Sequence, residues 1–280
     1  MTNPLISTTA LAVLAGAVLQ LGGANGALAS SPEVTAQYAG LPMRFEPNVG
    51  LSDPRVRFLA RGNGYTLFLT GTESVMVLAK PAPDGPADVV RMRYAGANAQ
   101  PRVEGVQPLP GITNYFLGND PARWRTNIVS FAQVRYHEIY AGIDLVYYGS
   151  GRDIEYDFIV QPSADPSAIR LSYDGARRLS VNRSGELVLA VAGGELRQKA
   201  PVIYQDGPEG PALVAGAYVL RGNQVGFKVG AYDHSRPLII DPVMVYSTSL
   251  GGSNFDQATS IHVGPTGDAM TRRYAQGSHA

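Results

Sequence analysis

With 280 residues the chain is long enough for one large domain or two modest ones, and its 23 basic residues balance 23 acidic ones, which argues against a nucleic-acid partner. Cysteine is absent, which excludes disulfides, thiolate metal sites and cysteine nucleophiles. Glycine (32) and proline (20) are abundant beside 45% hydrophobic residues, a balance that predicts many turns between short strands.

The N-terminal segment has the pattern of an export signal. Leu5–Leu21 is an uncharged apolar run, and Ala27–Ala29 provides a small-x-small cleavage pattern. We expect a signal peptide over residues 1–29, a polar linker over 30–41, and an exported protein located outside the cell or at its surface. A transmembrane anchor is the alternative, but the run is short for a span of about 20 residues, so no membrane span is expected after cleavage.

From residue 42 onward, short runs of β-branched and aromatic residues alternate with Gly, Asn, Asp and Pro, and no segment shows a helical period. The pattern predicts an all-β domain over 42–243, made of one or two antiparallel sandwich-like units of hairpins and meanders, with a subdivision near 135 if there are two. The expected strands are Val56–Leu59, Tyr65–Leu69, Ser74–Leu78, Val89–Tyr94, Pro101–Pro110, Ile112–Leu117, Ile143–Tyr148, Ile154–Val160, Ile169–Tyr173, Leu179–Val181, Leu187–Val191, Glu195–Lys199, Pro201–Gln205, Val214–Leu220, Val225–Tyr232 and Leu238–Ile240.

The most informative stretch is the hairpin in which Ile143–Tyr148 and Ile154–Val160 flank the glycine-containing turn Gly149–Arg152. Pairing Tyr148 with Asp153 sets the predicted register. Alternation then places apolar side chains on one face, which we expect to be buried: Ile143, Leu145, Tyr147, Ile154, Tyr156 and Phe158. The opposite face carries Asp144, Val146, Tyr148, Asp153, Glu155 and Asp157.

The predicted register places Asp144 opposite Asp157, and directly opposed like charges are unfavourable unless a cation or a proton relieves them. One explanation is a structural charge network with a nearby base, drawn from Arg135, His137, Arg152 and Arg170. A second is Ca²⁺ held by Asp144, Glu155 and Asp157 with loop carbonyls, although no Asp-x-Asp-x-Asp-Gly loop is present. A third is a glycosidase-like carboxylate pair.

Two aromatic residues are candidates for stacking on a ligand. Trp124, the single tryptophan, lies between two arginines, and Tyr148 lies on the acidic face of the hairpin. The more common role for such a tryptophan is a core anchor whose N–H bonds to the backbone, and this is the expectation here. Tyrosine is also simply favoured in strands.

No catalytic motif stands out. The histidines His137, His234, His262 and His279 lack metal-site spacing, and neither a Gly-x-Ser-x-Gly elbow nor a glycine-rich phosphate loop is present. We therefore expect no catalytic residues and no cofactor other than the Ca²⁺ alternative. The four Asp-Pro pairs at Asp53, Asp120, Asp165 and Asp241 predict turns between strands.

Several motifs, in this order along the chain, resemble the uncharacterised N-terminal domain of bacterial SBBP-repeat (β-propeller repeat) surface proteins. They are Phe45–Gly50, Tyr115–Gly118 with Trp124, Tyr140–Tyr148, Arg197–Pro201 and Asp241–Pro242. Leu51 stands where that family usually has glutamine. The resemblance implies a surface location, a propeller following the domain and no assigned catalytic residues.

Residues 244–280 resemble the start of the first SBBP repeat, but the sequence diverges after Ala269. Because one propeller blade needs four strands in about 40–45 residues, we expect an incomplete repeat with a mobile end, as in a truncated or frameshifted product. The predicted function is an exported, non-catalytic surface or adhesion-type module whose partner is a surface protein or a glycan. The alternative is a carbohydrate-binding or carbohydrate-active protein that uses the acidic face of the 143–160 hairpin. The oligomeric state stays open.

Overall fold

The computed structural model describes residues 43–62, 64–78, 87–150, 153–242, 244–245, 258–263 and 269–273. The predicted signal peptide and linker lie outside these residues, as does most of the predicted SBBP repeat. The described part consists of antiparallel strands and two short 3₁₀ turns and contains no α-helix, so the predicted all-β class is confirmed. It also contains no helix long and apolar enough to cross a membrane.

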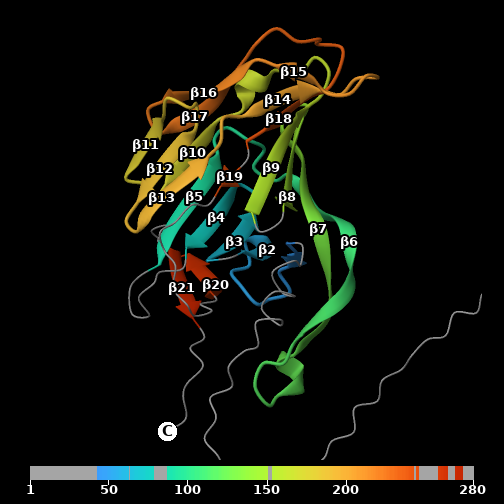
Figure 1. Ribbon diagram of the computed structural model, residues 1–280. Coiled ribbons are helices and arrows are strands. Elements are labelled where there is room, and N and C mark those ends of the chain that lie inside the picture. The colour runs from blue at the N-terminus through green and yellow to red at the C-terminus, as the bar shows by residue number, and fades with distance from the viewer. Residues whose placement is uncertain are drawn as a thin grey trace, which may run out of the picture. The chain divides into compact units, whose positions relative to one another are not determined.

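Short connections join most consecutive strands (Figure 1). They are β1 Phe45–Pro47, β2 Val56–Gly62, β3 Tyr65–Thr70, β4 Glu73–Leu78, β5 Asp88–Tyr94, β6 Arg102–Tyr115, β7 Arg125–Tyr140, β8 Ile143–Ser150, β9 Asp153–Val160, β10 Leu171–Asp174, β11 Arg178–Val181, β12 Leu187–Val191, β13 Gly194–Gln198, β14 Val202–Gln205, β15 Ala212–Val214, β16 Gly216–Arg221, β17 Gln224–Val229, β18 Leu238–Asp241, β19 Met244–Val245, β20 Ala258–Val263 and β21 Ala269–Arg273. The 3₁₀ turns are η1 Pro121–Arg123 and η2 Pro166–Ala168.

One large sheet dominates the domain and curls almost into a barrel (Figure 1). Its strand order is β15-β14-β18-β9-β8-β7-β1-β2-β3-β4-β5-β10-β17-β16, with β6 paired to β7. The two end strands, β15 and β16, are consecutive in the chain and are separated by Ala215 alone, whose carbonyl accepts a hydrogen bond from Gly230 N at 2.7 Å. A small sheet, β11-β12-β13-β19, and the β20–β21 hairpin complete the strand pairing described.

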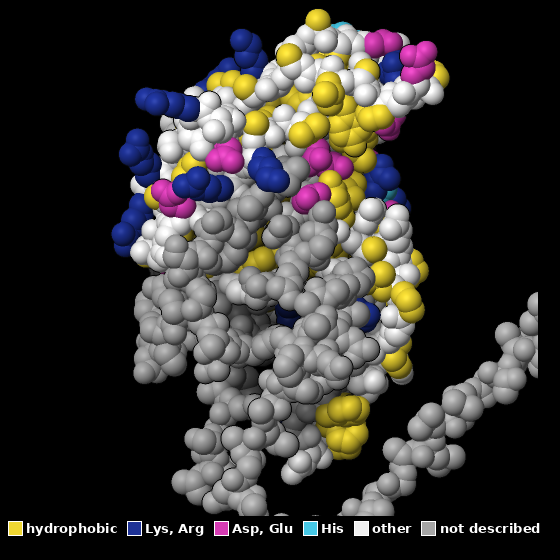
Figure 2. Space-filling model, viewed as in Figure 1, with side chains coloured by type: hydrophobic (Ala, Val, Ile, Leu, Met, Phe, Trp, Pro, Cys, Tyr) yellow, Lys and Arg dark blue, Asp and Glu magenta, His cyan; other side chains and the backbone are white. Residues whose placement is uncertain are grey.

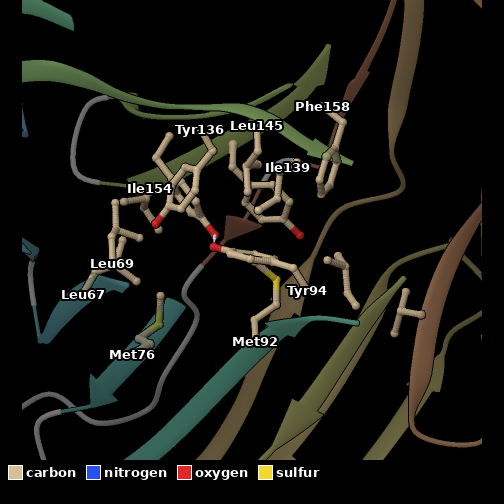
Figure 3. Close-up of a cluster of buried hydrophobic side chains, with 14 of the residues drawn as sticks. Leu67, Leu69, Met76, Met92, Tyr94, Tyr136, Ile139, Leu145, Ile154 and Phe158 are labelled. Atoms are coloured by element: carbon tan, nitrogen blue, oxygen red, sulfur yellow. Dashed lines mark hydrogen bonds between the residues drawn. The ribbon is translucent and has the colours of Figure 1, made fainter. Parts of the chain in front are cut away.

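The core forms where the small sheet packs against the inner face of the large one. Leu187, Leu189 and Leu196 of the small sheet belong to the same buried cluster as the side chains of β3, β4, β5, β8 and β9. Tyrosines fill the interior, and their hydroxyls are hydrogen-bonded, as buried polar groups require. The Tyr94 and Tyr147 hydroxyls lie 2.9 Å apart, and Figure 3 shows Tyr94 reaching toward the β7–β9 side of this cluster.

The predicted facing of the β8–β9 hairpin is confirmed, because every side chain assigned to its apolar face is buried, with none more than 2% exposed. The predicted register is wrong by two residues. Tyr148 pairs with Glu155 instead of Asp153, and the ladder extends to Ser150 and Asp153. A shift of two leaves each residue on its face, so the alternation that predicted the facing could not detect it.

None of the predicted strands corresponds to β7, Arg125–Tyr140. This strand runs through position 135 inside the large sheet, and positive φ angles at Asn127 and Glu138 interrupt its alternation. The predicted Pro101–Pro110 and Ile112–Leu117 form the single strand β6, with a register shift between Pro108 and Ile112. The predicted Val214–Leu220 divides at Ala215 into β15 and β16.

Candidate functional site

Two regions bring together chemically informative side chains, and the first is an acidic cluster formed by Tyr148, Glu155, Asp157 and Asp241. Tyr148 of β8 donates its hydroxyl to Asp157 Oδ1 of β9 at 3.0 Å and pairs with Glu155 in the ladder. On the other side of β9, Ile240 of β18 pairs with Phe158. Continuing that register by one residue on each strand places Asp241 opposite Asp157.

Burial and like charge raise the pKa of two of these carboxyls. Burial, followed by the charge of Asp241, raises the pKa of Asp157 to about 7, although its bond to Tyr148 lowers it. Burial and the charge of Glu155 raise the pKa of Asp241 to about 6. Burial and the charge of Asp157 also raise the pKa of Tyr148 above its usual range. The pair is therefore poised to hold a proton near neutral pH.

Asp241 also differs from the other three aspartates that precede a proline. Asp53, Asp120 and Asp165 each accept a hydrogen bond from the backbone N–H two residues later, so the turns predicted at these three positions are confirmed. Asp241 lies at the end of β18, and its buried Oδ1 has no hydrogen-bond partner among the described residues. The turn pattern concealed this member of the acidic cluster, and no local signal in the sequence marks it.

Asp144 belongs to a different arrangement from the one predicted. It pairs with Ile159, not with Asp157. Arg135 donates to its Oδ2 from Nη2 at 2.7 Å and from Nε at 3.1 Å, and Glu138 N donates to its Oδ1 at 2.7 Å. Arg135 was one of the four bases predicted to neutralise the acidic face, and it does so for Asp144.

The structure offers no support for the calcium alternative in the part it describes. No group of three or more His, Asp or Glu side chains there is arranged to hold a metal ion. A cavity between the two sheets, lined in part by Ser74, Tyr173 and Gln198, has a volume of about 20 Å³. That is the space of about one water molecule, so this cavity is too small for a sugar or a cofactor.

The second region is the arm, residues 107–129, in which β6 and β7 continue as a two-stranded ribbon beyond the last β7–β8 pair at Gln133 (Figure 1). The arm is fixed to the rest of the sheet along one face. The Tyr115 hydroxyl and Thr113 Oγ1 both donate to the carboxylate of Glu46 in β1, which also accepts from Arg61 Nη1 at 3.0 Å. Ile128 is buried on this same face.

The loop after β1 provides a further attachment for the arm. Arg125 Nε donates to Val49 O at 2.9 Å. Asn48 holds that loop in shape, because its Oδ1 accepts from three backbone N–H groups and its Nδ2 donates to three carbonyls. Two of the motifs quoted for the family resemblance therefore contact each other: Tyr115–Trp124 lies in the arm, and Phe45–Gly50 holds the arm in place. We call Phe45–Gly50 the mount of the arm. No functional role was predicted for Glu46, Asn48 or Arg125.

The opposite side of the arm and the end of the arm are apolar and exposed. Five of the eight exposed large hydrophobic side chains in the described part of the chain lie here: Ile112, Phe116, Leu117, Trp124 and Val129. Figure 2 shows hydrophobic side chains along the β6–β7 arm and gathered at its end. We call these five residues the apolar surface of the arm. Ile112 pairs with Val129 across the ribbon, and Phe116 and Trp124 form an edge-to-face pair with centroids 5.0 Å apart.

The predicted role of Trp124 as a core anchor is wrong, because 36% of the residue is exposed. The accompanying prediction of a backbone partner is confirmed, since Trp124 Nε1 donates to Gly118 O at 3.1 Å. The two stacking candidates lie in different regions. Trp124 is on the arm, whereas Tyr148 is half-buried in the acidic cluster.

Comparison with known proteins gives a family without an activity. Residues 45–243 match the model of a family described as a domain of unknown function (DUF7948), and the chain belongs to this family. The match covers the β-rich domain and includes the arm, its mount and the acidic cluster. No curated protein and no solved structure matches the chain.

Proposed function

We propose that this DUF7948 member is an exported, non-catalytic surface module of the adhesion type, and that the arm is the element through which it binds. The export part rests on the apolar run Leu5–Leu21 and the small-residue pattern at Ala27–Ala29. The resemblance to SBBP-repeat surface proteins supports the same location and suggests that residues 244–280 begin a propeller repeat.

The observation that carries the binding role is the concentration of exposed apolar side chains on a firmly mounted arm. Exposed large hydrophobic residues are scattered singly on most surfaces, whereas a contiguous group marks an interaction site. The bonds of Glu46 and Arg125 fix the arm before any partner arrives, so little conformational entropy is lost on binding.

Export can be tested by expressing the full chain in a bacterial host and determining the mature N-terminus and its location. We expect cleavage after Ala29, protein outside the cytoplasm, and accumulation of the uncleaved chain when Ala27→Arg disrupts the cleavage pattern. An uncleaved wild-type chain confined to the cytosol would refute the proposed role at the cell surface.

A second candidate function, carbohydrate binding, is favoured by one observation: Asp157 and Asp241 form a carboxylate pair with raised pKa values beside the hydroxyl of Tyr148. Carboxylates and aromatic rings are common sugar-binding groups. A glycan array probed with wild type and with the double variant Asp157→Asn/Asp241→Asn tests it, and binding that survives the double substitution would refute this role for the cluster.

A further inference from the structure

The arm presents a surface whose geometry limits what it can bind. The apolar surface of the arm lies on the side of a two-stranded ribbon and around its end, and Phe116 and Ile112 are 63% and 56% exposed. Such a projecting surface does not enclose a small ligand, because ligand sites are concave. Its partner must be larger than the arm, either a protein with a matching groove or a lipid bilayer.

The hydrogen bonds at the end of the arm are compatible with the interfacial region of a bilayer. The interior of a bilayer offers no donors or acceptors, so groups that enter it must be satisfied within the protein. The indole N–H of Trp124 is already bonded to Gly118 O, and Asn127 N is bonded to Asn114 Oδ1. In the loop at the end of the arm, the N–H groups of Arg123 and Trp124 donate to carbonyls of η1 and its N-cap.

The charges on the arm fit the same environment. Asp120 is the only carboxylate between Gly105 and Glu138, and its Oδ1 accepts from Ala122 N. The guanidinium of Arg125 is bonded to backbone carbonyls. Arg123 is exposed next to Trp124 and has the charge that anionic headgroups attract. Tryptophan with a neighbouring arginine is typical of residues at the membrane interface.

We propose that the apolar surface of the arm binds the interfacial region of a lipid bilayer, lying on it side-on. This inference rests on the proposed function, because it names the partner of the arm of an exported module. The side of the arm that carries Thr113, Tyr115 and Ile128 stays against the domain, and the side that carries Ile112, Phe116 and Trp124 meets the lipid. The arm does not span the bilayer, and Arg123 remains at the headgroups.

The single tryptophan makes the test direct, since Trp124 emission reports on the arm and on nothing else in the chain. The full chain is mixed with vesicles of phosphatidylcholine, with and without phosphatidylglycerol, and its flotation and emission are measured. We expect emission to move to shorter wavelengths on adding vesicles, quenching by brominated lipid, and stronger binding to the anionic vesicles.

Variants separate the arm from the rest of the chain. Phe116→Ser and Ile112→Ser should each weaken vesicle binding roughly tenfold, the loss expected for one buried apolar side chain. Leu213→Ser, at an apolar residue on β15 that is even more exposed, 79%, is the control and should leave binding unchanged. All variants retain Leu5–Leu21, so this run cannot produce a difference between them. Trp124→Phe should float normally.

Three results would overturn the proposal. The first is flotation without any change in Trp124 emission, and the second is equal weakening by Phe116→Ser and Leu213→Ser. The third is an emission shift on raising the protein concentration without vesicles, accompanied by sedimentation as a larger species, which would identify a second copy as the partner. A chain that is not exported but still binds vesicles through the arm would refute the proposed function and leave this inference standing.

Discussion

Asp157 of β9 and Asp241 of β18 lie opposite one another on adjacent strands, with no basic partner among the residues that the structure describes. On the other side of β9, Asp144 of β8 is bonded to Arg135. The charge of Asp157 is therefore repelled by a neighbouring carboxylate, whereas the charge of Asp144 is stabilised by a base. This difference predicts that neutralising the two aspartates changes the stability of the fold in opposite directions.

Neutralising substitutions should change the stability in opposite directions. Asp157→Asn removes a repelled, half-buried charge and should raise the free energy of unfolding at pH 8 by about 1 to 2 kcal/mol. Asp144→Asn removes the charge that Arg135 and Glu138 N bind and should lower it by about 1 to 2 kcal/mol. Urea unfolding of both variants checks the signs, and a loss of stability in Asp157→Asn would contradict the repulsion.

The same pair predicts a pH dependence. The pKa values of Asp157 and Asp241 are raised to about 7 and about 6, so between roughly pH 4 and pH 7 the folded chain binds more protons than the unfolded one. Stability should therefore fall as pH rises through this window because of this pair. Melting temperatures of wild type and of Asp157→Asn/Asp241→Asn, compared at each pH, isolate the effect. Identical pH profiles in the two proteins would rule it out.

Asn48 should be critical for the mount of the arm. Asn48→Ala removes its bonds to backbone donors and acceptors and leaves several of them unpaired, which should cost about 2 to 4 kcal/mol. Asn119→Ala, at an exposed residue in the loop of the arm, should change stability by less than about 0.5 kcal/mol. Chemical denaturation of the two variants provides the comparison.

Glu46 should control how firmly the arm is held. Glu46→Gln weakens the bonds to Tyr115, Thr113 and Arg61, and we expect faster amide hydrogen exchange in residues 112–129 with little change in β8 and β9. Glu104→Gln, at a carboxylate near the other end of β6, should leave exchange in the arm unchanged. Equal protection of the arm in both variants would show that Glu46 does not hold it.

Gly175 tests a close approach between backbones. It has a φ of +86°, and an added Cβ would lie 1.9 Å from the carbonyl oxygen of Val89, so Gly175→Ala should cost about 3 kcal/mol or more. Gly222 also has a positive φ, +65°, but an added Cβ would meet nothing within 4 Å. Gly222→Ala should therefore cost only about 1 kcal/mol, the strain alone. Thermal unfolding of the two variants separates the cost of the steric clash with Val89 from the cost of the backbone strain.

The sequence by itself determined the all-β class and the facing of the central hairpin. Alternation along Ile143–Tyr148 and Ile154–Val160 is a local property, and burial of one face follows from it directly. The same alternation is blind to a shift of two residues, which is why the opposition of Asp144 and Asp157 was wrong. Local bonding also decided the turns at Asp53, Asp120 and Asp165, because each aspartate bonds its own backbone.

Only the tertiary structure decided which strands are neighbours, and the candidate sites depend on that order. Asp241 joins Asp157 because β18 pairs with β9, and Glu46 meets Tyr115 because β1 lies beside β7 in the sheet. Neither pairing has a local signal, since it arises from long-range packing of whole strands around one core. The exposure of Trp124 was hidden for the same reason: β6 and β7 continue past the rest of the sheet, which no periodicity in either strand records.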